Sequence, residues 1–173
     1  MRKEGVTIKD LINTLPQVGK VQWISIRAER GSKPEEMEEV YANTEHGLEG
    51  DHYGGGANGK RQVTFINEEH LKSVASFLGK EVLDPGLLRR NIMVSGINLL
   101  ALKDQQFQVG EAVLEMTGLC HPCSRMEQNL GEGGYNAMRG HGGITARILK
   151  SGKIKQGDTI KLISQQEKND SEA

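Results

Sequence analysis

The sequence predicts a mainly β protein, a closed β-barrel with one or two short helices, and three observations support this. Short segments in which apolar and polar residues alternate recur along the chain. A single segment has the start and stop signals of a well-defined helix. The 22 glycines gather largely in clusters, which is typical of tight turns rather than of long helices. Many short strands without alternating helices favour a barrel or a sandwich over a βαβ fold.

The individual elements follow from these patterns. A short amphipathic helix is expected within residues 7–15, where Pro16 stops it. The clearest helix begins after Asn67 as its N-cap, has two glutamates in its first turn and ends at Gly79. Strands are expected at residues 20–27, 61–66, 91–94, 107–110, 111–117, 144–149 and 159–163, the fourth and fifth as two strands or one bent strand.

The length of 173 residues corresponds to one domain with tails. We expect an N-terminal extension at residues 1–18, a barrel domain at 19–163 and a disordered polar tail at 164–173. The net charge of −1 gives no argument for a nucleic-acid partner. No apolar run approaches the ~20 residues that cross a bilayer, and the first residues lack the apolar core of a signal peptide. We therefore expect a cytoplasmic protein without a membrane partner.

The densest group of chemically active residues is the segment 117–126, which follows a predicted strand. It holds both cysteines of the chain, Cys120 and Cys123, with His121 between them. Arg125 lies two residues beyond Cys123 and would favour its thiolate form. In a cytosolic protein, such a pair is more often catalytic, metal-binding or redox-active than structural. The alternative is that one or both cysteines are small buried apolar residues.

The spacing of the two cysteines allows two other interpretations. A thioredoxin-like dithiol normally follows an early strand and opens a long helix, whereas this pair lies late in a β-rich chain. A zinc site would use Cys120, His121, Cys123 and His141, but structural zinc usually needs a second closely spaced ligand pair. Both interpretations have less support than a reactive thiol.

Two further clusters suit an anionic ligand. Residues 46–52 (HGLEGDH) place Asp51 beside His52, and three glycines at 54–56 follow, whose N–H groups can cradle an anion. Arg61 begins a predicted strand, and Arg89 and Arg90 stand together before Asn91. Arginine forks suit phosphate and carboxylate ligands, although a single arginine is more often a solvated surface residue.

Taken together, the order of these segments resembles the MOSC domain, a family named after the C-terminal domain of molybdenum cofactor sulfurase. The resemblance runs from about residue 19 to residue 163 and depends on the segments 47–52 (GLEGDH), 61–63 (RQV), 88–92 (LRRNI), 94–96 (VSG), 110–111 (GE), 122–126 (PCSRM), 141–144 (HGGI) and 157–158 (GD). It implies a β-barrel of the type first seen in a pyruvate kinase domain. It also implies binding of the molybdenum cofactor, a pterin dithiolene with a phosphate.

The resemblance places the family's essential cysteine at Cys123, as a molybdenum ligand or as the carrier of a persulfide sulfur. The residues expected around the cofactor are Asp51, His52, Arg61, Arg89, Arg90, Asn91, Arg125 and His141. The pyridoxal phosphate desulfurase domain of the fused sulfurases has no counterpart in this chain.

Three functions are therefore open. The first is a molybdenum-dependent reductase of N-hydroxylated substrates, which needs an electron-donor protein because two cysteines cannot hold a cluster that usually takes four. The second is a sulfur carrier that receives a persulfide at Cys123 from a cysteine desulfurase. The third is a structural zinc-binding or interaction domain.

Overall fold

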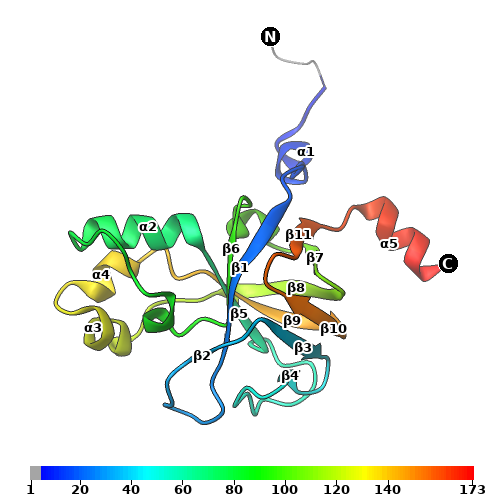
Figure 1. Cartoon of the computed structure of the whole chain (residues 1–173). Coiled ribbons are helices and arrows are strands. Elements are labelled where there is room, and N and C mark those ends of the chain that lie inside the picture. Colours follow the sequence, from blue (N-terminus) through cyan, green and yellow to red (C-terminus); the bar gives the residue numbers. More distant parts are fainter. Residues whose placement is uncertain (1–4) are drawn as a thin grey trace.

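Seven strands close into a barrel in the computed structural model, which describes residues 5–173 (Figure 1). Around the barrel, the strands are β1 (Gly19–Ile26), β6 (Ile92–Ser95), β5 (Val63–Asn67), β9 (Ile144–Lys150), β8 (Ala112–Leu119), β7 (Gln106–Val109) and β11 (Thr159–Leu162). The pairing of β11 with β1 closes the ring, and all neighbours are antiparallel except β5 and β6. The predicted closed, mainly β barrel is confirmed.

The strands form because their apolar side chains alternate between the barrel interior and its surface. In β7, Phe107 and Val109 are fully buried while their neighbours are partly exposed. The interior contains mostly Val, Ile and Leu, and Phe65 and Phe107 meet edge to face across it with ring centroids 5.6 Å apart. The low aromatic content of the chain therefore fits a barrel that is filled by aliphatic side chains.

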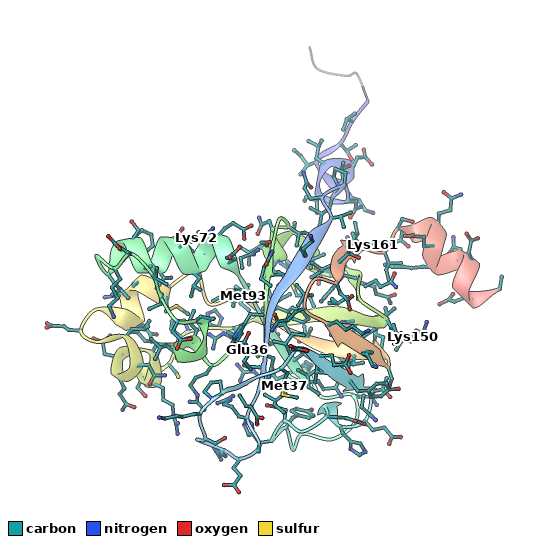
Figure 2. The ribbon with its side chains drawn as sticks, in the orientation of Figure 1. Glu36, Met37, Lys72, Met93, Lys150 and Lys161 are labelled. Carbon is teal, nitrogen blue, oxygen red and sulfur yellow. The ribbon has the colours of Figure 1, made fainter. Side chains whose placement is uncertain are left out.

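A small second sheet lies beside the barrel. It consists of β10 (Gly152–Lys155), β3 (Glu39–Asn43) and β4 (Gly47–Leu48). A short strand, β2 (Glu35–Glu36), pairs with the end of β1. Figure 2 labels Glu36 and Met37 close to this end of the barrel. The chain between β1 and β3 is thereby held across one end of the barrel.

The helices α2 (Glu68–Phe77), α3 (Ser124–Leu130) and α4 (Gly134–Met138) gather on one side of the barrel (Figure 1). With the 3-10 turn η1 (Pro85–Leu88) they enclose a second apolar core, which includes Leu88, Met93, Met126 and Met138. Met93 lies on β6, where this strand meets α2 (Figure 2). A further 3-10 turn, η2 (Leu99–Leu102), follows β6. None of the helices in residues 5–173 is both long and apolar enough to cross a membrane.

The helices are more numerous than the one or two that the sequence predicts. Helices α3 and α4 have only seven and five residues and are bordered by glycines, so they are too short to show a helical periodicity. Asn67 is the N-cap of α2, as predicted, but its side chain makes no capping hydrogen bond: its amide donates to the Ile97 carbonyl oxygen at 2.6 Å and accepts from the Leu99 N–H.

Both ends of the described chain also carry helices. Helix α1 (Ile8–Ile12) lies within the predicted N-terminal helix, and its capping box joins Thr7 to Asp10. The predicted disordered tail instead contains α5 (Gln165–Glu172). This helix forms because Ser164 and Glu167 exchange hydrogen bonds in a second capping box, which begins the helix.

Candidate functional site

A cleft of about 580 Å³ opens where the end of the barrel meets η1 and α3. Its lining includes Trp23, Lys33, Glu36, Asp84, Arg89 and Arg125. Trp23 comes from β1, Arg89 ends η1, and Arg125 lies in the first turn of α3. Arg89 has a left-handed backbone with φ 58°, which a non-glycine residue adopts only rarely. The cleft therefore brings together segments that are far apart in the sequence.

Four arginines interact electrostatically at this end of the barrel: Arg27, Arg89, Arg90 and Arg125. Burial lowers the pKa of Arg27; Asp51 opposes this effect, whereas Arg125 and Arg90 add to it. Burial also lowers the pKa of Arg89, and the charges of Arg27, Arg125 and Arg90 lower it further. These mutual effects show that like charges are held together here. We call the four residues the arginine cluster.

Cys123 lies beside this cluster. Its charge acts on Arg89 in the direction that raises the pKa of the guanidinium, opposite to the effect of the neighbouring arginines. Cys123 is exposed and occupies the N-cap position of α3, whereas Cys120 is buried. The structure thus separates the two thiols, one accessible to a ligand and one packed inside.

Arg90 is held by backbone groups on two sides. Its Nε donates to the Gly142 carbonyl oxygen at 2.7 Å, and its Nη1 donates to the Leu88 carbonyl oxygen at 2.8 Å. The Nη2 atom is buried and has no partner.

Gly142 has no room for a side chain, because a Cβ there would overlap the Cys120 carbonyl. The Gly143 carbonyl oxygen accepts from the Cys120 N–H at 2.9 Å. The segment 141–143 therefore fixes both Arg90 and the strand that leads to Cys123.

Asp51 and His52 hold the backbone of Arg27. The buried Asp51 carboxylate accepts from the Arg27 N–H at 2.9 Å, and the His52 N–H donates to the Arg27 carbonyl oxygen at 2.7 Å. The Nδ1 atom of His52 lies 3.7 Å from the Asp51 carboxylate. One guanidinium nitrogen of Arg27, Nη1, is buried without a partner. Asp51 and His52, which the sequence predicts to contact the cofactor, therefore position an arginine of the cluster.

Three predicted site residues lie elsewhere or are engaged elsewhere. Arg61 is exposed in the turn before β5 and is not among the groups that affect Arg27 or Arg89. The Asn91 amide joins three strands: it accepts from the N–H and the hydroxyl of Thr64, both at 3.0 Å, and donates to the Ser25 carbonyl oxygen at 3.3 Å. The His141 ring packs against α2, where it meets His70 and Phe77 with centroid distances of 5.0 Å and 5.5 Å.

The loop that contains the glycine cluster 54–56 folds against the ring of Tyr53. A Cβ on Gly55 or on Gly59 would overlap the ring or the hydroxyl of Tyr53, and this hydroxyl donates to the Gly56 carbonyl oxygen at 3.1 Å. These glycines therefore let the loop close over Tyr53.

Within residues 5–173 there is no group of three His, Cys, Asp or Glu side chains that could hold a metal ion. The zinc site considered for Cys120, His121, Cys123 and His141 is therefore not formed.

The comparisons with known proteins agree with this architecture. The family model of the MOSC domain matches residues 45–161, more than half of the chain. The chain belongs to the MOSC domain family. A comparison with curated proteins found no match.

Several solved structures share the MOSC fold of this chain. The crystal structure of YuaD from Bacillus subtilis has a TM-score of 0.73 and 21% identity, and the match covers 85% of this chain and 97% of that one. YiiM from Geobacillus stearothermophilus has a TM-score of 0.68 and 15% identity, with coverages of 84% and 75%. YiiM from Escherichia coli has a TM-score of 0.65 and 17% identity, with coverages of 84% and 70%. At these identities the likeness shows the fold.

Arg27 is the member of the arginine cluster that sequence reasoning missed. It directly follows β1, where Ser25 and Ile26 are both buried. No break in the sequence pattern marks this residue, because Arg27 continues the apolar–polar alternation of Ile24, Ser25 and Ile26 and therefore looks like a solvent-facing residue. The residues whose charges act on Arg27, Asp51 and Arg125, are distant in sequence, so no local pattern indicates that they lie near it.

Proposed function

We propose that this protein binds the molybdenum cofactor at the arginine cluster and the adjoining cleft, and that it reduces N-hydroxylated substrates. The family supports the first part, because MOSC domains are linked to molybdenum cofactor biology. The observation that carries the proposal is the set of four guanidinium groups beside an exposed thiol. The Asp51 carboxylate opposes the positive charges around Arg27.

The charges of the site call for an anion. The four guanidinium groups and Lys33 outnumber the three carboxylates of the site (Asp51, Glu36 and Asp84) and the Cys123 thiol, so the site keeps a net positive charge even with Cys123 ionised. The unpaired, buried Nη1 of Arg27 and Nη2 of Arg90 are donors that need an acceptor. The phosphate of a pterin cofactor supplies two negative charges and several acceptor oxygens, which guanidinium groups bind well. The residues present therefore fit this group.

The thiol of Cys123 is the group that we assign to the metal. A thiolate is a soft ligand and suits molybdenum. The charges of Cys123 and Arg89 interact, so the thiol lies within electrostatic reach of the arginine cluster. When bound, the cofactor supplies the two-electron redox chemistry of the reaction. The protein's own part is to hold the phosphate, keep the thiolate available and leave the cleft open for substrate. We further propose an electron-donor protein as the partner.

The test is elemental analysis of protein purified from a host that makes the cofactor. We expect stoichiometric molybdenum in the wild type, its loss in Cys123→Ser, and its retention in Cys120→Ala. Reduction of an N-hydroxylated base by the loaded protein, with a chemical electron donor, is expected to follow the metal content. A wild type free of molybdenum, or equal molybdenum in wild type and Cys123→Ser, would contradict the proposal.

The accessibility of Cys123 also favours a second function, a sulfur carrier that is loaded by a cysteine desulfurase. A persulfide on this thiol adds about 32 Da, one sulfur atom, and is stabilised as an anion by the same arginines. Intact-mass spectrometry of the metal-free protein decides between the two. A gain of about one sulfur atom that disappears in Cys123→Ser, without bound molybdenum, supports the carrier.

A further inference from the structure

The free nitrogen of Arg90 lies beside the segment that carries Cys123. A Cβ on Gly142 would overlap the Cys120 carbonyl oxygen and would lie 3.4 Å from Nη2 of Arg90. Both atoms therefore border the same narrow space, next to the segment that runs from Cys120 to Cys123. Arg90 is only 7% exposed, and its Nη2 is buried without a partner. A buried guanidinium nitrogen in this position calls for an oxygen atom as acceptor.

Two further arginines of the cluster lie near the thiol and are open to solvent from the cleft. The charge of Cys123 acts on Arg89, and Arg125 follows Cys123 by two residues in the first turn of α3. Arg89 and Arg125 both line the cleft, and the thiol is exposed. The site therefore joins donors for an oxyanion with a nucleophile. An anion that uses both needs oxygen atoms for the guanidinium groups and an atom that a thiolate can attack.

Thiosulfate meets both requirements. It is a tetrahedral dianion, and its oxygen atoms suit guanidinium forks in the same way as those of phosphate. Unlike phosphate, it carries an outer sulfur atom bonded to a second sulfur, and thiolates attack sulfur in such bonds. The net positive charge of the site favours a dianion, and the cleft of about 580 Å³ has ample room for a small one.

We propose that the protein is a sulfurtransferase, in which the arginine cluster binds the oxygen atoms of thiosulfate and Cys123 takes its outer sulfur. The Cys123 thiolate attacks the outer sulfur, so a bond forms between Sγ and that atom while the sulfur–sulfur bond of thiosulfate breaks. The electron pair of the broken bond leaves with sulfite, and Cys123 becomes a persulfide. The charges balance, and no other oxidant or reductant takes part. This inference rests on the sulfur-carrier function proposed above and names the class of its donor.

The arginines act on the leaving group in this step. As the bond breaks, negative charge grows on the oxygen atoms of sulfite, and guanidinium groups already placed there stabilise it. The persulfide then gives its outer sulfur to a second nucleophile; cyanide takes it as thiocyanate and restores the Cys123 thiolate. Cys120 is 8% exposed, so a dissolved anion does not reach it. Cys123 is therefore the thiol that should gain sulfur.

The first experiment gives thiosulfate to metal-free protein and then adds cyanide. We expect a gain of about 32 Da in intact mass, sulfite in an amount equal to the persulfide formed, and thiocyanate once cyanide is present. Cys123→Ser should abolish all three signals, and Cys120→Ala should retain them. A wild type that gains no sulfur and releases no sulfite would overturn the proposal, and so would equal turnover in Cys123→Ser.

The second experiment tests the arginines through the KM for thiosulfate. Arg125→Gln removes an exposed side chain and should raise this KM about tenfold, because one charged donor is lost. Arg139→Gln is the control, because Arg139 is also exposed and its charge does not act on Arg27 or Arg89. Phosphate should compete with thiosulfate in the wild type. Thermal unfolding shows whether Arg125→Gln is folded, and Arg89→Gln replaces it if it is not. An unchanged KM in the folded variant, or no competition by phosphate, would contradict binding at the cluster.

Polysulfide separates this inference from the sulfur-carrier function, because it delivers sulfur without an oxyanion. Loading of Cys123 by both donors, with a raised KM in Arg125→Gln for thiosulfate alone, supports the proposal. Loading by polysulfide but not by thiosulfate would leave the carrier function standing and overturn thiosulfate as the donor. Loading by neither would overturn both. The molybdenum content, which decides the reductase, enters none of these results.

Discussion

At the scale of single residues, Arg90 supports the fold and keeps one donor for the ligand that we propose. It is almost completely buried, and two of its nitrogens bind carbonyl oxygens from η1 and from the segment 141–143. The third, Nη2, is unpaired. A lysine in this place has one nitrogen on a flexible stem and cannot reproduce the planar fork.

We therefore expect Arg90→Lys to reduce both stability and molybdenum content. One buried carbonyl of the pair Leu88 and Gly142 would lose its donor, at a cost of about 1–3 kcal/mol in the free energy of unfolding. Urea unfolding measures this loss, and elemental analysis measures the metal. Arg30→Lys is the control, because Arg30 is exposed and outside the arginine cluster. Equal stability of Arg90→Lys and wild type would show that these bonds contribute little.

The sequence was sufficient to single out the segment 117–126 and three of the four arginines of the cluster, because cysteine and paired arginines are rare enough to stand out. It was not sufficient to assign partners. Asn91 follows two arginines of the cluster, yet its amide bonds to Thr64 and Ser25 on neighbouring strands. Strand pairing between segments far apart in the sequence decides which carbonyl or hydroxyl lies beside a given amide. Local sequence patterns therefore cannot predict these partners.

At the scale of elements, the packing of the segment 141–143 on α2 connects the helical side of the molecule with the cluster. The His141 ring meets His70 and Phe77, both on α2, while the next residue, Gly142, binds Arg90. The strands and α2 were predictable because their own residues carry the alternation or the helix start and stop signals. This segment was not, because its conformation depends on a contact between two histidines that are 71 positions apart.

The His70 and His141 pair should make stability depend on pH. Burial lowers the pKa of His70 below its ordinary 6.5, the charge of His141 lowers it further, and Glu69 opposes both. Below pH 6.5 the unfolded chain takes up a proton at His70, whereas the folded protein resists this protonation. The free energy of unfolding is therefore highest above pH 6.5 and decreases as the pH falls toward the lower pKa of His70 in the folded protein. Thermal unfolding between about pH 7.5 and about pH 5.5 should show this decline.

His70→Gln removes the titrating group at the centre of this contact, and we expect it to flatten the pH dependence. The matched control is His46→Gln, since the His46 side chain is 73% exposed and should leave the slope as in the wild type. An unchanged slope in His70→Gln would mean that other groups cause any acid sensitivity.

At the scale of the whole molecule, the barrel is completed by two segments from opposite ends of the chain. Gly19 and Lys20 of β1 pair with Ile160 and Thr159 of β11. Ile160 is fully buried in the barrel core, so the closing strand also fills the interior. The sequence predicted both strands, but their pairing follows only once the other five strands have curled into a ring.

The end of β11 is therefore the expected end of the cooperative unit, although α5 continues beyond it. The ion pair that links α5 to the barrel, Lys161 with Glu167 at 3.9 Å, joins two exposed side chains, and such pairs contribute about 0–1 kcal/mol. A chain that ends at residue 163 should keep the free energy of unfolding within about 0.5 kcal/mol of the full chain. A chain that ends at residue 158 lacks β11 and should not fold cooperatively, because the barrel stays open and its core is exposed to water. Urea unfolding followed by circular dichroism compares the two truncations, and a loss of more than about 1 kcal/mol in the first would mean that α5 is part of the folded core.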